Sequence, residues 1–358
     1  MNADEQRTTP KLENPAAVEA TLQQWLADNV YPEQRVTISN FSIPEATGMS
    51  NITVLFDVMV DGQSDAQAMV ARIQAQGDKL AFPHYDLPLQ VAIMQTLETV
   101  EGIRVPSVIA QEKSSAILGS PFYIMQRVDG LIPPDIPPYH MDGWIVDSSP
   151  EERGQLWWSA VEMMATLHQQ DIQRAPLAQF IQEHDFSKNL DEQLDYWQHY
   201  QEWGLEGADN AHCSKALAWL REHKPEGEAL GFCWGDSRMA NVIFNDDKSD
   251  VAALLDWEML ALGNPLQDIA WWIFMDEVFS TGIGFERLEG FPTRAETMQK
   301  WSALTGLGDE HLHYYLVFAG LRISLILARM SLAKGDNDML NESFASVYMD
   351  SILEQGAA

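Results

Sequence analysis

The spacing of apolar residues predicts a helix near the start of the chain. Asn14-Pro15 supplies an N-cap and a first-turn proline, and apolar side chains then recur at helical spacing at Val18, Leu22, Trp25 and Leu26. Runs of β-branched and apolar residues follow and predict three strands, at 36–41, 52–60 and 66–73. The chain therefore opens with one helix and a strand-rich segment.

A second helix and a change in composition complete this first part. Asp86 can cap a helix over 87–100, and strand-like residues return at 105–106 and 122–128. Four prolines then lie within 133–138, a stiff stretch that fits neither a helix nor a central strand. We therefore expect an α+β protein with a β-rich domain at 1–130 and a second domain at 131–358.

The second domain is expected to be mainly helical. Apolar periodicity predicts helices at 150–170, 189–203, 210–223, 266–279, 294–304, 310–333 and 339–353. Arg322 and Arg329 interrupt the most apolar stretch, 314–330, which is shorter than a bilayer requires and is predicted to be a buried helix. One strand-rich island, 230–256, interrupts the helices.

The charge of the chain excludes several classes of partner. Lys and Arg number 22 and Asp and Glu number 53, a formal charge of -31, so neither nucleic acid nor an anionic membrane is expected as a partner. Two cysteines are too few for a disulfide scaffold or a Cys-rich zinc site. The N-terminal residues lack the pattern of a signal peptide. These features favour a cytoplasmic protein.

The strand-rich island carries the candidate chemistry. Apolar runs at 242–244 and 251–255 flank a turn rich in Asn, Asp and Ser, and so predict a hairpin. Asn241 and Asp256 stand at its open end and should lie side by side, which suits Mg²⁺ because this ion prefers oxygen ligands shared with phosphates. Asp236 is a second carboxylate nearby that could orient a substrate hydroxyl and accept its proton.

These residues resemble a known family. Asp236, four intervening residues, Asn241 and a hairpin ending at Asp256 are similar to the catalytic loop and metal-binding aspartate of the protein-kinase-like superfamily. The text of 235–241, 255–258 and 262–268 resembles the aminoglycoside phosphotransferase (APH) and choline-kinase-like branch, and most of all the phosphotransferase domain associated with acyl-CoA dehydrogenases. The resemblance implies a bilobal fold with Mg²⁺ and ATP in the cleft between the lobes.

The resemblance also implies roles for residues of the first domain. Gly48, Met49, Ser50 and Asn51 would form a phosphate loop, although this stretch also reads as a simple turn. Arg72 would clamp phosphates, unless its side chain merely extends to solvent. Gln126 to Val128 would hydrogen-bond adenine through the backbone.

Three further residues of the second domain are candidates for binding substrate or supporting the catalytic loop. These are Arg238, Glu258 and Asp268. For Arg238 a salt bridge within the loop is an equal alternative, and for Asp268 a structural cap or loop brace is favoured over catalysis.

Three positions depart from the family pattern. Trp234 stands where the family usually has a loop-bracing His, Gln90 where it has a helix glutamate that pairs with the strand Lys or Arg, and Asn264 where it has an Asp. Two alternatives to an enzyme therefore stay open. One is a nucleotide-binding pseudokinase, and the other is a small-molecule binding protein without nucleotide affinity.

Tryptophan pairs on two predicted helices raise another alternative. Trp157, Trp158, Trp271 and Trp272 could form an aromatic cage for a quaternary ammonium, but tryptophan along helices is more often core. His168 is read in the same way, as a core-facing residue. No zinc site is expected.

The expected activity is Mg²⁺-dependent transfer of the ATP γ-phosphoryl group to a hydroxyl of a small molecule. Hydroxyacyl-CoA, amino sugars and choline-like molecules are the candidate acceptors, and the acidic charge favours a cationic one. The partners expected are a nucleotide and this acceptor, bound to a monomer or homodimer.

Overall fold

The computed structural model describes residues 14–44, 51–77 and 80–355. The chain divides into two compact units, each described by itself. Unit 1 comprises Met1–Gln95 and Pro106–Val128, and unit 2 comprises Thr96–Val105 and Asp129–Ala358. Unit 2 therefore includes a short piece of chain that precedes the last strands of unit 1.

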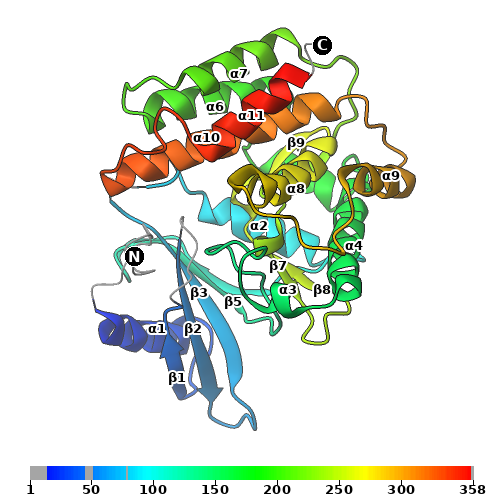
Figure 1. Cartoon of the computed structure of the whole chain (residues 1–358). Coiled ribbons are helices and arrows are strands. Elements are labelled where there is room, and N and C mark those ends of the chain that lie inside the picture. Colours follow the sequence, from blue (N-terminus) through cyan, green and yellow to red (C-terminus); the bar gives the residue numbers. More distant parts are fainter. Residues whose placement is uncertain (1–13, 45–50, 78–79, 356–358) are drawn as a thin grey trace. The chain divides into compact units, whose positions relative to one another are not determined.

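Unit 1 is built on a five-stranded antiparallel sheet with the strand order β1-β2-β3-β5-β4 (Figure 1). The strands are β1 (Val36–Ser42), β2 (Asn51–Val60), β3 (Gln67–Gln74), β4 (Val108–Glu112) and β5 (Phe122–Gln126). The first three predicted strands are confirmed to within a residue at most ends. The strand predicted at 105–106 begins instead at Val108, because proline at 106 cannot donate to the ladder.

Helix α1 (Pro15–Asn29) covers this sheet. The side chain of Asn14 accepts a hydrogen bond from the backbone N–H of Ala17 (3.2 Å), which confirms the predicted N-cap. Leu22, Trp25 and Leu26 of α1 join the inward-facing residues of the strands in one apolar core. The other helix, α2 (Leu87–Leu97), ends three residues earlier than predicted.

Unit 2 is mainly helical. Its helices are α3 (Trp144–Asp147), α4 (Pro150–His168), α5 (Leu177–Glu183), α6 (Leu190–Gly204), α7 (Ala211–Glu222), α8 (Leu266–Val278), α9 (Arg294–Thr305), α10 (Leu312–Lys334) and α11 (Phe344–Gln355). The seven long helices that the sequence predicts are confirmed. The short α3 and α5 were not predicted, because one or two turns show no clear period.

Helix α10 is the central helix of unit 2 and contacts α6, α7, α8 and α11. It is long and apolar enough to cross a membrane, but 89% of its most apolar window is buried inside the protein. Gly320 allows the close approach of α11, since a Cβ there would lie 2.6 Å from the side chain of Met349. The prediction of a buried helix is therefore confirmed.

Two small antiparallel pairs of strands complete unit 2. Strand β7 (Val242–Phe244) pairs with β8 (Val251–Leu254), the hairpin that the sequence predicts. Strand β6 (Gly231–Cys233) pairs with β9 (Ala261–Gly263), a short strand that was not predicted. The loop between β6 and β7 carries Asp236 and Asn241, so both pairs hold it at its ends.

Candidate active site

The open end of the hairpin brings Asn241 and Asp256 together as predicted. The backbone N–H of Leu255 donates to the carbonyl oxygen of Asn241 (2.9 Å), which places Asp256 one residue beyond that bond. Asp256 adopts a left-handed backbone conformation (φ 62°, ψ 69°), which turns the chain from β8 into the short helix η3 (Trp257–Met259). Aspartate tolerates this conformation better than most residues do. Glu258, in η3, is half-buried.

Asp236 is held by three donors. Its Oδ1 accepts the indole N–H of Trp271 (3.0 Å), its Oδ2 accepts the amide of Asn241 (2.7 Å), and the Nε of Arg238 lies 3.1 Å from both oxygens. The residue is 8% exposed. The carboxylate is therefore fixed in one orientation before any substrate binds, which favours a role in positioning a reacting group.

The amide of Asn241 is oriented by the same contacts. Its Nδ2 donates to both the backbone oxygen (2.9 Å) and the Oδ2 of Asp236. Because both amide hydrogens are used in this way, Oδ1 faces away from Asp236 and is the atom available to a cation. The described residues contain no cluster of three or more His, Cys, Asp or Glu side chains arranged for a metal. An amide oxygen beside one carboxylate nevertheless fits Mg²⁺, which keeps waters and phosphate oxygens as its other ligands.

Arg238 bridges two carboxylates. Besides Asp236 it contacts Asp135, whose Oδ2 lies 2.6 Å from Nη1 of Arg238. Burial opposes the charge of this guanidinium, but Asp135 and Asp236 outweigh it and raise the pKa of Arg238 above its usual value. Arg238 thus forms a salt bridge within the loop, one of the two roles predicted for it, and it also joins the proline-rich segment to the loop of residues 234–241.

Asp268, at the start of α8, anchors the backbone of the loop. Its two carboxylate oxygens accept the N–H groups of Trp234 (2.6 Å) and Gly235 (2.9 Å), and it is fully buried. The Nε2 of His168 also contacts it at 3.0 Å. Trp301 donates its indole N–H to Nδ1 of His168 (2.9 Å), so Nε2 carries the proton given to Asp268. Asp268 is therefore a loop brace.

Trp234 stands where the resembled family usually has a histidine that braces the loop. Here the tryptophan supports the loop. Its side chain is fully buried, and its indole N–H donates to the carbonyl oxygen of Leu255 (2.8 Å), next to Asp256. At Gly235 (φ 94°) a Cβ would meet the carbonyl oxygen of Met259 at 1.9 Å, so only glycine fits. This departure from the family pattern therefore leaves the loop supported.

The residues predicted to bind nucleotide all belong to unit 1. Gly48, Met49 and Ser50 lie outside the described residues. Asn51, at the start of β2, is fully buried, and neither atom of its amide has a hydrogen-bond partner in the part of the chain that the structure describes. Arg72, on β3, donates to the hydroxyl of Thr53 (2.8 Å) across the sheet. Gln90 is 2% exposed, and its Nε2 has no partner among the described residues.

The backbone after β5 is partly engaged in hydrogen bonds within unit 1. The N–H of Gln126 donates to Ser107 (2.8 Å) and that of Arg127 donates to Ala68 (2.9 Å), so both are used within unit 1. Among the described residues, Val128 forms no backbone hydrogen bond of this kind. Of the two predicted hinge residues, Gln126 thus has its N–H engaged within unit 1.

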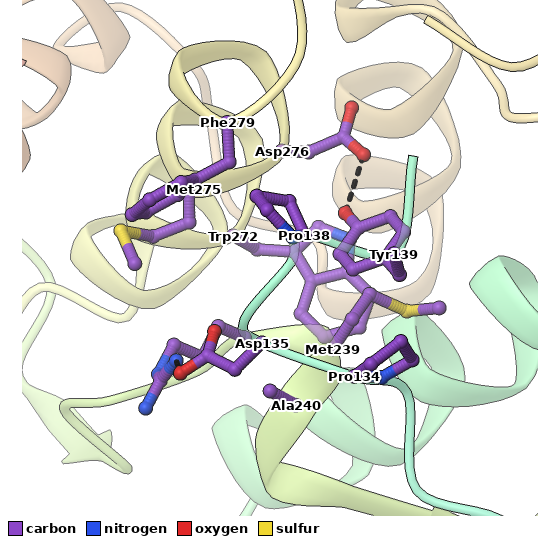
Figure 2. A pocket seen from close by; sticks show the side chains of 11 residues that line it. Pro134, Asp135, Pro138, Tyr139, Met239, Ala240, Trp272, Met275, Asp276 and Phe279 are labelled. Atoms are coloured by element: carbon purple, nitrogen blue, oxygen red, sulfur yellow. Dashed lines mark hydrogen bonds and ion pairs between the residues drawn. The ribbon is translucent and has the colours of Figure 1, made fainter. Parts of the chain in front are cut away.

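A small cavity lies beside the loop in unit 2. It encloses about 20 Å³, room for one water molecule. Figure 2 shows the side chains around it, with the hydroxyl of Tyr139 directed to Asp276 at 2.6 Å. Burial opposes the charge of Asp276, but His140 and Arg287 outweigh it and lower its pKa. The lining residues are Pro134, Asp135, Pro138, Tyr139, Arg238, Met239, Ala240, Trp272, Met275, Asp276 and Phe279.

Sequence reasoning missed Trp271, Asp135 and Arg322 as parts of the site. Trp271 was read as core, and it is 1% exposed, but its N–H reaches Asp236. Arg322 makes a cation–π contact with Trp271, and its guanidinium carbon lies 4.1 Å from the centroid of the indole ring. These contacts join residues that are 35 or more positions apart in the chain, so no local sequence pattern reveals them. The sequence feature that could have indicated the role of Arg322 is the presence of two charged residues, Arg322 and Arg329, inside an apolar helix.

Comparison with solved structures defines the class of protein. A candidate aminoglycoside phosphotransferase from Ralstonia eutropha aligns over 94% of this chain and 98% of its own, with a TM-score of 0.67 and 20% identity. Aminoglycoside phosphotransferase APH(4)-Ia, in a ternary complex with ADP and hygromycin B, aligns over 94% and 99% with a TM-score of 0.59 and 15% identity. The fold is thus the bilobal protein-kinase-like α+β fold that the sequence predicts.

The sequence then identifies the family. A model described as the phosphotransferase enzyme family matches residues 56–304, more than half of the chain, so the chain belongs to this family. Acyl-CoA dehydrogenase family member 10 of Mus musculus is 25% identical over 307 residues, which cover 80% of this chain. The match spans only 27% of that relative, and the chain likewise spans about a third of the other relatives. The predicted likeness to the acyl-CoA-dehydrogenase-associated branch is confirmed.

Proposed function

We propose that this protein transfers the γ-phosphoryl group of ATP to a hydroxyl group of a small molecule. Its family and its structural neighbours support phosphotransferase activity. The observation that carries the proposal is the geometry around Asp236, whose carboxylate is held in one orientation by Trp271, Asn241 and Arg238. Such preorganisation suits a group that positions a nucleophile.

Asp236 would act on the acceptor. Its carboxylate accepts a hydrogen bond from the acceptor hydroxyl and takes its proton as the oxygen forms a bond to the γ-phosphorus. The bond from that phosphorus to the bridging oxygen breaks, and ADP leaves. Because the transition state is loose, orientation and charge neutralisation supply most of the rate.

Asn241 and Asp256 would hold Mg²⁺ through the Oδ1 of the amide and the carboxylate. When bound, Mg²⁺ supplies positive charge to the β- and γ-phosphate oxygens of ATP. The hydrogen bonds from Asn241 to Asp236 would keep this amide in place at the same time. Asn241 and the positioning carboxylate of Asp236 are thus part of one hydrogen-bond network.

Unit 1 would bind the nucleotide. Arg72 would pair with phosphate oxygens. The amide of Asn51, which has no partner among the described residues, would belong to the predicted phosphate loop with Gly48, Met49 and Ser50. The backbone of Val128 would hydrogen-bond adenine. The complex of APH(4)-Ia with ADP supports a nucleotide as the phosphoryl donor.

The acceptors that we propose are those that the sequence suggests. The charge of -31 favours a cationic acceptor such as an amino sugar or a choline-like molecule. The relatives that carry an acyl-CoA dehydrogenase name support a hydroxyacyl-CoA. Both classes offer the hydroxyl that the mechanism requires.

Two experiments test the proposal. A panel of amino sugars, choline-like alcohols and hydroxyacyl-CoAs is incubated with protein, ATP and Mg²⁺, and ADP release is measured. At least one member should be consumed with one ADP per phosphorylated product. A melting experiment with Mg-ATP separates the alternatives, because a pseudokinase would be stabilised without turnover and a protein without nucleotide affinity would show no shift. No consumption of any acceptor would contradict the proposal.

A further inference from the structure

Trp271 and Arg322 connect two helices of unit 2 to Asp236. The indole N–H of Trp271, on α8, donates to Oδ1 of Asp236 at 3.0 Å. Of the three residues that donate to this carboxylate, Trp271 is the one outside the loop of residues 234–241. It therefore ties the carboxylate to the rigid core of unit 2.

Arg322 contacts both Trp271 and the loop. Its guanidinium stacks on the indole ring at 4.1 Å, and its Nη2 donates to the carbonyl oxygen of Gly235, the residue before Asp236. It is 3% exposed, and its Nε has no acceptor among the described residues. Burial lowers its pKa to about 10, so it stays charged at neutral pH.

Burial of the Arg322 guanidinium costs free energy, because a buried charge loses its hydration. Contacts with the Trp271 ring and the carbonyl oxygen of Gly235 offset part of this cost. A cation on the face of an indole ring withdraws electron density from the ring, and the N–H at its edge becomes a stronger donor. Here that N–H points at the carboxylate to which the mechanism assigns the acceptor hydroxyl. The same cation fixes the backbone at Gly235.

We propose that Trp271, supported by Arg322, is a positioning residue that orients the Asp236 carboxylate toward the acceptor hydroxyl. This inference rests on the proposed function. A residue in this role affects the rate of transfer much more than Mg-ATP binding, because it contacts Asp236 and neither Asn241 nor Asp256 directly.

The test compares Trp271→Phe with Trp157→Phe. Trp157 is also 1% exposed, and its indole N–H donates to the hydroxyl of Thr297 at 3.0 Å, so both variants lose one buried hydrogen bond of equal length. For Trp271→Phe, kcat with the best acceptor of the panel should fall about 10- to 100-fold, the effect of losing a hydrogen bond to a charged group. The KM for ATP should not change. Trp157→Phe should keep the wild-type kcat.

A second measurement tests the contact without turnover and without a folded Trp271 variant. In protein labelled with ¹⁵N-indole tryptophan, Asp236→Asn should shift one indole resonance strongly and leave that of Trp157 in place. An unchanged indole spectrum in Asp236→Asn, or equal kcat in Trp271→Phe and Trp157→Phe, would overturn the inference. If the wild-type protein transfers phosphate to no acceptor, the proposed function fails and this positioning role fails with it, whereas failure of the inference alone leaves wild-type turnover intact.

Discussion

The polar residues proposed for the acceptor side and for the nucleotide side differ in how they are held. In unit 2, the carboxylates of Asp236 and Asp268 each accept several hydrogen bonds, at least one of them from a residue more than 30 positions away in the chain. In unit 1, the amides of Asn51 and Gln90 are buried with atoms that have no partner among the described residues. Buried polar groups without partners are unusual in proteins.

This difference suggests that the two units are organised in different ways. The loop of residues 234–241 is held by hydrogen bonds within the protein, through the carboxylates of Asp236 and Asp268. If unit 1 binds ATP as proposed, the nucleotide would add contacts on this side that the described residues do not supply. Substitutions on the two sides, each with a control, test whether they are held differently.

Replacing Asp268 should have the largest effect on stability. Asp268→Ala removes a fully buried carboxylate and leaves the N–H groups of Trp234 and Gly235 and the Nε2 of His168 without their acceptor. We expect a loss of about 3–5 kcal/mol in the free energy of unfolding. Denaturation by urea measures it.

The matched control for Asp268 is Asp250. It pairs with Arg104 at 2.6 Å, but both side chains are more than 40% exposed. Asp250→Ala should therefore cost less than about 1 kcal/mol. Similar losses in the two variants would show that the loop is not the tightly held region described above.

Replacing Asp256 should weaken nucleotide binding. Asp256→Ala removes the proposed carboxylate ligand of Mg²⁺, and the affinity for Mg-ATP measured by calorimetry should fall at least about tenfold. The affinity for ATP in the presence of EDTA should be the same as that of the wild type. Unchanged affinity for Mg-ATP would remove Asp256 from the proposed site.

Replacing Gln90 should have the smallest effect. Gln90→Met removes an amide nitrogen that has no partner among the described residues and keeps the volume, so the free energy of unfolding should change by less than about 1 kcal/mol. Gln193 is the control, since it is also buried and its Nε2 donates to the carbonyl oxygen of Leu262 (3.1 Å). Gln193→Met should cost about 1–3 kcal/mol. Equal losses would mean that Gln90 is as well satisfied as Gln193.

The sequence predicts the parts of this molecule that depend on local patterns. The N-cap at Asn14, the long periodic helices and the β7–β8 hairpin follow from periodicity and turn residues. The proximity of Asn241 and Asp256 follows from the hairpin. The short elements α3, α5 and β9 carry too few residues to show a period.

The support of the candidate site could not be predicted in the same way. Trp271 was read as a core residue, which its burial confirms, yet nothing local indicates that its N–H meets Asp236, 35 positions earlier. The same holds for His168, which is in the core as expected but also braces Asp268, 100 positions later. Contacts of this kind depend on how helices pack, and a single sequence does not specify that packing residue by residue.

The central claim is that the carboxylate of Asp236 positions the acceptor hydroxyl for phosphoryl transfer. The most direct test measures transfer and Mg-ATP binding in parallel for the wild type and Asp236→Ala. We predict that transfer to the best acceptor falls by roughly 10²–10⁴-fold. The Kd for Mg-ATP should change far less, because the amide of Asn241 keeps its hydrogen bond to the backbone oxygen of Asp236 (2.9 Å). Wild-type turnover in purified Asp236→Ala protein would contradict it.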